Sequence, residues 1–245
     1  MTVHGTTQER FAGVKAVMAA SLASGADLGA SFCATQGGET VVDIWGGHTG
    51  PDKSRDWERD TIVNVYSTTK TMAALTALLL ADRGVFDLLD KVAKYWPEFA
   101  SEGKADVTIA QLLSHSAGLS GWKEPLRRED LYDWSKCTDL LARQAPFWEP
   151  GTAPGYHALT QGYLVGEVIR RATGKTVGTV FREEIAEPLG ADFHIGLPAS
   201  EDDRVAELVP PPVAVGAQVG VDFREGPHGI RCPPRDNHGL LAPLV

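Results

Sequence analysis

Long hydrophobic runs are absent from this 245-residue sequence. No stretch approaches the roughly 20 consecutive apolar residues that a membrane-spanning helix requires. The first 25 residues also lack the basic opening and the continuous apolar run of a secretory signal peptide. We therefore expect no membrane partner and a cytoplasmic location.

Cysteine is scarce, since only Cys33, Cys137 and Cys232 occur, widely separated and odd in number. They form no C-x-x-C pair, so neither a zinc site nor a disulfide framework is predicted. The sequence also lacks the H-E-x-x-H, G-x-x-x-x-G-K-[ST] and G-x-G-x-x-G motifs. We expect no metal ion and no organic cofactor.

Basic residues are outnumbered, with 23 Lys and Arg against 32 Asp and Glu and a net charge of −9. Such a surface repels phosphate backbones, so nucleic acid is not an expected partner. Hydrophobic residues make up 43% of the chain, whose length fits one large domain or two small ones and allows a sizeable core. This composition suits a globular protein that acts on a small organic molecule.

The N-terminal third predicts a helix followed by a β-hairpin. Two β-prone runs, Leu28–Thr35 and Thr40–Trp45, flank a Gln-Gly-Gly-Glu turn. Apolar residues recur at helical spacing before the first run, which predicts an amphipathic helix. The residues expected on its inward face are Val14, Val17, Met18 and Leu22.

Helix signals dominate the rest of the chain. The strongest helix is predicted from Ser67 to about Asp82, with Gly84 as its stop and Met72, Leu75 and Leu79 on one face. A second strong helix follows Tyr156 and should end at Gly174. The remaining predictions are a Thr108–Gln111 capping box, a helix from about Thr176 to Glu187, and close packing at Gly162-x-x-x-Gly166.

Ser67-Thr68-Thr69-Lys70 is the candidate for nucleophilic chemistry. A serine hydroxyl is a poor nucleophile until a neighbouring group accepts its proton. A lysine three residues after a serine, at the start of a helix, brings its amine within hydrogen-bond reach of the hydroxyl. The helix N-terminus also favours a nearby oxyanion. Ser67 is therefore the predicted nucleophile and Lys70 its predicted base.

The same S-x-x-K spacing occurs at Ser101–Lys104 and at Ser120–Lys123, so spacing alone does not identify a nucleophile. The ordinary alternative for any such pair is a helix N-cap serine beside a solvated lysine. The first copy lies in the polar stretch ASEGKAD and the second in a Gly/Trp loop. Only Ser67 lies between an apolar run and a long apolar helix.

Several segments in the right order resemble the superfamily of serine β-lactamases, penicillin-binding D,D-peptidases and family VIII carboxylesterases. The nucleophile motif of that family resembles NVYSTTKTMAAL, its next helix and turn resemble VTIAQLLSHSAGL, and its tyrosine loop resembles FWEPGTAPGYHAL. The resemblance spans roughly residues 28–210. It implies an α/β (α+β) fold, with an antiparallel sheet flanked by helices in a single domain over residues 1–245 and a mostly helical subdomain at about 83–155.

The catalytic tyrosine of the family corresponds to Tyr156. The resemblance implies that its phenol shares a proton network with Ser67 and Lys70 and passes a proton to the leaving group. Without the resemblance, a partly buried tyrosine that closes a Pro/Gly loop is the simpler interpretation. The candidate substrate-binding residues are Trp122, Trp148 and His157. Aromatic walls suit ester acyl and alcohol groups, and ordinary core or loop packing is the equal alternative for each tryptophan.

His115 in SHSAGL is a weaker candidate for chemistry. The nucleophile elbow G-x-S-x-G does not fit, because position 114 is serine and not glycine. We therefore interpret His115 as a structural histidine at the end of a helix.

Two departures from the family concern the substrate and the end of the sheet. Many family members carry Asn two residues after the tyrosine, where this chain has Ala158; losing that amide contact favours simple esters. The family's third motif, a Lys-Thr-Gly or His-x-Gly triplet after the tyrosine, has no counterpart in the expected order. His48-Thr49-Gly50 precedes Ser67, and the later pairs, His228-Gly229 and His238-Gly239, fall within a tail, from about residue 221, that does not align. We expect a C-terminally truncated family member with an incomplete sheet.

The sequence therefore predicts a serine hydrolase that cleaves carboxylic esters through an acyl-enzyme intermediate. One alternative is an amidase of the β-lactamase or D,D-peptidase type, and a small-molecule ester or amide is the expected partner in either case. The other alternative is a catalytically inactive family member that at most binds a ligand.

Overall fold

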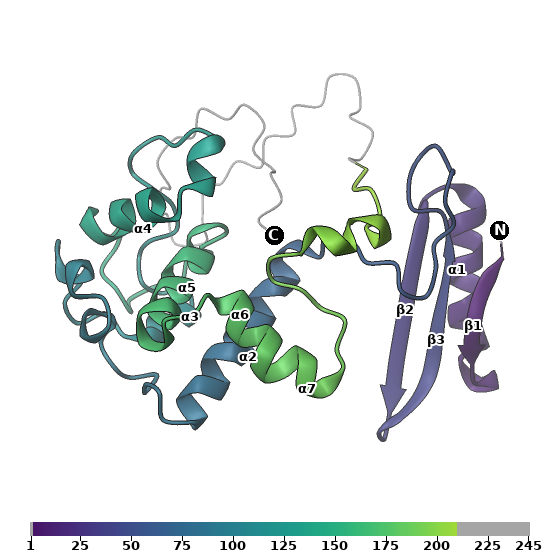
Figure 1. Cartoon of the computed structure of the whole chain (residues 1–245), viewed down its shortest axis with the longest axis horizontal. Helices are drawn as coiled ribbons and strands as arrows, with labels where there is room; N and C mark the ends of the chain where they lie inside the picture. Colours follow the sequence, from purple (N-terminus) through teal and green to yellow (C-terminus); the bar gives the residue numbers. More distant parts are fainter. Residues whose placement is uncertain (1, 210–245) are drawn as a thin grey trace. The chain divides into compact units, whose positions relative to one another are not determined.

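A computed structural model describes residues 2–209, which fall into two compact units. The first unit comprises residues 2–64 and 197–209, and the second comprises residues 65–196. Among the described residues, the first contains the sheet and the second is helical (Figure 1). The unaligned tail predicted from about residue 221 lies outside the described residues.

The sheet of the first unit has three antiparallel strands in the order β1 (Val3–Thr7), β3 (Glu39–Gly47) and β2 (Gly29–Gln36). Strands β2 and β3 confirm the predicted hairpin. Gln36 pairs with Glu39, which leaves Gly37 and Gly38 as a two-residue turn with φ of 59° and 83°. A two-residue turn with positive φ at both positions matches the twist of the flanking strands, and glycine adopts it without strain.

Helix α1 (Ala12–Ser24) packs against the sheet through part of the predicted face. Val14, Met18 and Leu22 join a core with Val42 and Ile44 of β3. The prediction for Val17 is wrong, because its side chain is 71% exposed. Positions 14, 18 and 22 form one stripe at a spacing of four residues, and Val17 lies beside this stripe.

Helix α2 (Thr69–Asp82) begins after a 3₁₀ turn at Tyr66–Thr68 and ends at Arg83 and Gly84, where Gly84 has a φ of 71°. This confirms the predicted helix and its stop. The predicted inward face is only partly correct. Met72 and Leu79 pack against the cluster around Phe181, whereas Leu75 is 43% exposed. A helix that is apolar on nearly every side does not reveal from its own sequence which side packs.

Helix α5 (Thr160–Thr173) is the central element of the second unit. It contacts four other helices: α2, α3 (Ile109–Leu113), α4 (Trp134–Arg143) and α6 (Val177–Phe181). It ends at Gly174, which has a φ of 73°, as predicted. Close packing holds at Gly166, where the Trp134 ring leaves no space for a Cβ atom, but not at Gly162, which faces open space.

The capping box of α3 is present. The Thr108 hydroxyl accepts from the Gln111 N–H, and the Gln111 side chain accepts from the Thr108 N–H. We expect Thr108→Ala to lower the free energy of unfolding by about 1 kcal/mol. The Gln111 N–H loses its hydrogen-bond acceptor, and the reciprocal bond from the Thr108 N–H loses its support. Thr108→Ser is the matched control, since it keeps the acceptor. Equal urea midpoints for the alanine and serine variants would show that the cap does not stabilise the protein.

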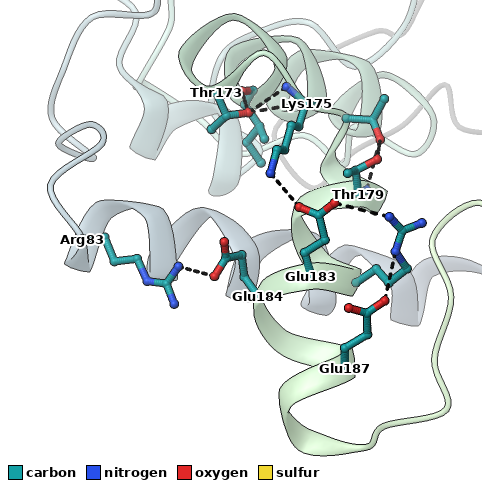
Figure 2. A network of polar contacts seen from close by, with 10 residues as sticks. Arg83, Thr173, Lys175, Thr179, Glu183, Glu184 and Glu187 are labelled. Atoms are coloured by element: carbon teal, nitrogen blue, oxygen red, sulfur yellow. Dashed lines mark hydrogen bonds and ion pairs between the residues drawn. The ribbon is translucent and has the colours of Figure 1, made fainter.

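The predicted helix from Thr176 to Glu187 forms, with one feature that the sequence did not indicate. Between α6 and α7 (Glu187–Leu189) the backbone is a π-helix at Arg182–Ala186. Exposed ion pairs surround this turn, since Glu183 accepts from Lys175 and Glu184 accepts from Arg83 at the end of α2 (Figure 2). These contacts tie α2 to the π-helical turn within the same unit.

No helix in the described part of the chain is both long and apolar enough to cross a membrane.

Candidate active site

The backbone presents Ser67 at the start of α2. Ser67 lies in the 3₁₀ turn that precedes the helix, and its side chain is exposed. Tyr66, directly before it, has a φ of 46°, which residues other than glycine adopt rarely. Such strained conformations gather at functional sites, where the surrounding structure holds them in place.

Three polar side chains meet at this point. The Lys70 Nζ donates to Ser67 Oγ at 3.2 Å, and the Tyr156 hydroxyl donates to the same oxygen at 2.7 Å. The Lys70 Nζ also lies 5.2 Å from the centre of the Tyr156 ring. Tyr156 thus reaches Ser67 Oγ from 89 positions away in the chain. The three predicted catalytic residues lie together, all within the unit 65–196.

The electrostatics of this cluster act on the phenol of Tyr156. Burial alone would raise the pKa of Tyr156, but the hydrogen bonds with Ser67 and Lys70 and the positive charge of Lys70 outweigh it, so the pKa lies below its usual value. A lowered phenol pKa makes the phenolate a more accessible proton acceptor near neutral pH. Tyr156 is 54% exposed, so it can also meet a leaving group at the surface.

Ser101 and Lys104, another S-x-x-K pair, are arranged differently. The Ser101 hydroxyl donates to the Ala142 carbonyl, and Lys104 donates to the carbonyls of Ser101 and Gln144. Lys104 is completely buried, which corrects the expectation of a solvated lysine; burial lowers its pKa to about 8. Lys123 is exposed and lies over the Phe147 ring. Lys104 donates to backbone carbonyls and the Ser101 hydroxyl donates elsewhere, so Ser67 differs from Ser101 by geometry as well as by its surroundings in sequence.

Trp148 supports the loop that carries Tyr156. Its indole N–H donates to the Ala153 carbonyl at 2.7 Å. Its ring lies so close to Gly155 that an added Cβ would come within 2.4 Å of it. The same ring meets His157 edge to face at 6.0 Å. Only glycine therefore fits directly before the tyrosine. A role for Trp148 in substrate binding stays a prediction.

The sequence predicts that His157 contacts the substrate, but the structure instead places this side chain completely inside the protein. Its Nε2 accepts from the Leu119 N–H at 3.0 Å, so Nδ1 carries the hydrogen and donates to the Gly155 carbonyl. Burial lowers the pKa of His157 to about 4, which keeps the ring neutral. Both ring nitrogens are hydrogen-bonded and the side chain has no exposed surface, so His157 supports the tyrosine loop from inside the protein.

Trp122 lies farther into the helical core. Its indole N–H donates to the Cys137 carbonyl at 3.0 Å, and its ring meets Tyr163 of α5 edge to face at 5.3 Å. The partly buried ring packs with the core of this unit. Substrate contact by Trp122 stays a prediction that these packing contacts do not require.

His115 makes the contacts of a structural histidine, as interpreted from the sequence, but it makes them beside Tyr156. Its ring lies 4.8 Å from that of Tyr156, and its backbone has a φ of 61°. The only sequence signal was its position in SHSAGL, directly after a predicted helix. Neither the left-handed backbone nor the contact with a residue 41 positions away can be derived from that pattern. Among residues 2–209, no group of three or more His, Cys, Asp or Glu side chains is arranged to hold a metal ion.

Comparison with known proteins identifies the family. The family model described as Beta-lactamase matches residues 14–241. The esterase/β-lactamase LipL of Mycobacterium tuberculosis is 38% identical over 85% of this chain and 49% of its own length. The esterase EstB of Burkholderia gladioli is 27% identical over 88% of this chain and 57% of its own.

Solved structures agree. A family VIII carboxylesterase matches with a TM-score of 0.81 and 51% identity, over 86% of this chain and 58% of that one. A penicillin-binding protein homologue from Caulobacter crescentus matches with a TM-score of 0.82 and 44% identity, over 86% and 57%. The chain thus spans about half the length of the relatives it matches. The antiparallel sheet, the helical unit and the matched model together show that the chain belongs to the β-lactamase family, with the β-lactamase/transpeptidase-like fold.

Proposed function

We propose that this chain is a serine hydrolase that cleaves carboxylic esters of small molecules through an acyl-enzyme intermediate. One observation carries the proposal: Ser67 Oγ is within hydrogen-bond distance of both the Lys70 amine and the Tyr156 hydroxyl. A serine oxygen beside two groups that can exchange protons is the arrangement that nucleophilic catalysis needs.

In the acylation step, Ser67 Oγ attacks the ester carbonyl and its proton passes to the Tyr156 and Lys70 pair. The alcohol leaves with a proton returned by the same pair, most directly from the Tyr156 hydroxyl. In the second step, water attacks the acyl carbon, gives a proton to the pair and releases the acid, while Ser67 regains its hydrogen. The α2 N-terminus favours the negative charge that develops on the carbonyl oxygen.

Esters are preferred to amides in this proposal because of the residue at position 158. An asparagine there would provide the amide contact that the family resemblance associates with β-lactam and peptide substrates, but the chain has Ala158 after the buried His157. Relatives named as a carboxylesterase and as an esterase support this preference. Hydrolysis of a chromogenic cephalosporin is the second activity to assay, since another relative is named a penicillin-binding protein homologue.

Hydrolysis of p-nitrophenyl acetate and butyrate, together with labelling by a fluorophosphonate, tests the proposal. We expect the wild-type chain to release p-nitrophenol and to carry the phosphonate on the peptide that contains Ser67. Ser67→Ala is expected to abolish both, because Ser67 Oγ is the oxygen that meets the Lys70 amine and the Tyr156 hydroxyl. Ser101→Ala is the matched control from another S-x-x-K pair. Equal rates in wild type and Ser67→Ala, with no labelling, would favour the alternative of a family member that only binds a ligand.

A further inference from the structure

His115 holds a strained conformation that the mechanism above does not explain. Among residues 2–209, four residues other than glycine have a positive φ, and two of them, Tyr66 and His115, lie at the candidate active site. Tyr66 directly precedes the nucleophile. His115 has a φ of 61° and follows α3, in a different part of the chain. Strain of this kind persists only when the surrounding contacts hold it.

His115 accepts hydrogen bonds from the tyrosine loop on both sides of Tyr156. The Gly155 N–H donates to the His115 carbonyl oxygen at 2.9 Å. The His157 N–H donates to the His115 Nδ1 at 3.0 Å. One residue therefore binds the backbone directly before and directly after the tyrosine, which fixes the direction in which the phenol points.

The His115 ring also touches the phenol itself. Its centre lies 4.8 Å from that of Tyr156, in a tilted arrangement. The Lys70 Nζ lies 5.2 Å from the centre of the same phenol ring. Tyr156 is thus in contact with a histidine ring and a lysine amine while its hydroxyl meets Ser67.

The hydrogen bond from the His157 N–H to His115 Nδ1 requires a neutral imidazole. Nδ1 can accept a hydrogen bond only when it carries no proton, so the hydrogen must be on Nε2. The titratable groups that face the ring are Lys70, Tyr156 and His157. Burial lowers the pKa of His115, and the positive charge of Lys70 lowers it further. Both effects keep Nδ1 available as an acceptor near neutral pH.

We propose that His115 is a positioning residue: its carbonyl oxygen and Nδ1 hold Gly155 and His157 so that the Tyr156 hydroxyl stays on Ser67 Oγ. The inference deepens the proposed function and rests on it, because positioning matters for turnover only if Tyr156 transfers protons. His115 does not touch the reacting atoms itself. Its effect is therefore expected on the rate of the chemical step and not on substrate affinity.

Two variants separate the acceptor from the ring. His115→Asn keeps an acceptor oxygen close to the position of Nδ1, and asparagine tolerates positive φ better than most residues. His115→Phe keeps a ring against Tyr156 but offers no acceptor. Per active site, as counted by phosphonate labelling, we expect His115→Phe to lower kcat for p-nitrophenyl butyrate about 10- to 100-fold with little change in KM, the scale of a misplaced catalytic group. His115→Asn should restore most of the lost kcat.

NMR spectroscopy tests the hydrogen bond directly and does not depend on activity. We expect NMR spectra of ¹⁵N-labelled protein to show a coupling between the His157 amide nitrogen and the His115 Nδ1, across the N–H···N hydrogen bond. The His115 ring should be the Nε2–H tautomer. Exchange of the His157 amide with solvent should be slow in wild type and His115→Asn, and faster in His115→Phe.

A protonated Nδ1 in wild type, a missing coupling, or wild-type kcat in a folded His115→Phe variant would overturn the inference. A wild-type chain that shows the coupling but neither hydrolyses esters nor reacts with the phosphonate would refute the proposed function. The hydrogen bond between His157 and His115 would still be established in that case. The two failures are therefore distinguishable.

Discussion

Replacement of Lys70 by methionine is expected to slow the reaction of Ser67 with a fluorophosphonate, and the hydrolysis of p-nitrophenyl esters, by about 10²- to 10⁴-fold. The Lys70 amine is 3.2 Å from Ser67 Oγ, and its positive charge is one of the influences that lower the pKa of Tyr156. Removing the amine takes away one proton-transfer partner of Ser67. It also makes Tyr156 a poorer proton acceptor, because the pKa of its phenol is then lowered less. Methionine keeps an unbranched chain of similar length, so α2 should remain folded.

The control for this substitution comes from the chain's own copies of the motif. Lys123→Met makes the same chemical change at the same S-x-x-K spacing, but Lys123 is exposed and lies over the Phe147 ring. We expect it to react at the wild-type rate. Second-order rate constants for phosphonate inactivation compare the variants without interference from product release. A loss of less than tenfold in Lys70→Met would show that Lys70 is not the base.

Replacement of Glu167 by alanine is expected to lower the free energy of unfolding by about 3 kcal/mol, at the lower end for breaking a buried ion pair. The side chain is 1% exposed on α5 and accepts hydrogen bonds from Arg170, Arg171 and the Trp134 indole. Alanine would leave that indole N–H without its partner and two guanidinium groups without their counter-ion. The two arginines are partly exposed and can turn to solvent, which limits the loss. A chain of this size should melt roughly 6–12 °C lower.

Two further variants show whether burial is the reason. Glu167→Gln keeps an acceptor for Trp134 but removes the charge, so its loss should be intermediate. Glu183→Ala removes a carboxylate that pairs with Lys175 and Arg182 near the surface (Figure 2), where solvent and salt weaken ion pairs, and little change is expected. Similar melting temperatures for Glu167→Ala and Glu183→Ala would contradict the argument.

The pH dependence of this difference has a definite sign. Burial alone would raise the pKa of Glu167, but the hydrogen bonds from Arg170, Arg171 and Trp134 outweigh it and hold the pKa below its usual value. A carboxylate with a lowered folded-state pKa stabilises the protein above its unfolded-state pKa, and this contribution is lost as pH falls through the folded-state value. The difference in free energy of unfolding between wild type and Glu167→Ala should therefore become smaller as the pH is lowered.

The features that the sequence predicted well are those that local signals determine. The Gly37-Gly38 turn, the α3 capping box and the helix stops at Gly84 and Gly174 each depend on a few neighbouring residues. The resemblance to the family supplied Tyr156, which no local pattern marks. Its distance of 2.7 Å from Ser67 Oγ then agrees with the proposed pairing, although catalysis itself stays a prediction.

The features that the sequence did not predict depend on packing between distant segments. Leu75 and Val17 belong to apolar stretches, yet both are exposed because another side of each helix packs. Lys104 lies in a polar stretch, yet it is buried. The Gln144 carbonyl, 40 positions away, accepts a hydrogen bond from its amine and so compensates for the loss of water. The same limit applies to His115 and His157, whose roles follow from hydrogen bonds across 38 to 42 positions.

The helical unit over residues 65–196 contains Ser67, Lys70 and Tyr156 together with the histidines beneath the tyrosine loop. The hydrogen bonds that join these residues therefore lie inside one stretch of about 130 consecutive residues. Substitutions in β1, β2 and β3 therefore replace none of the residues that form these hydrogen bonds.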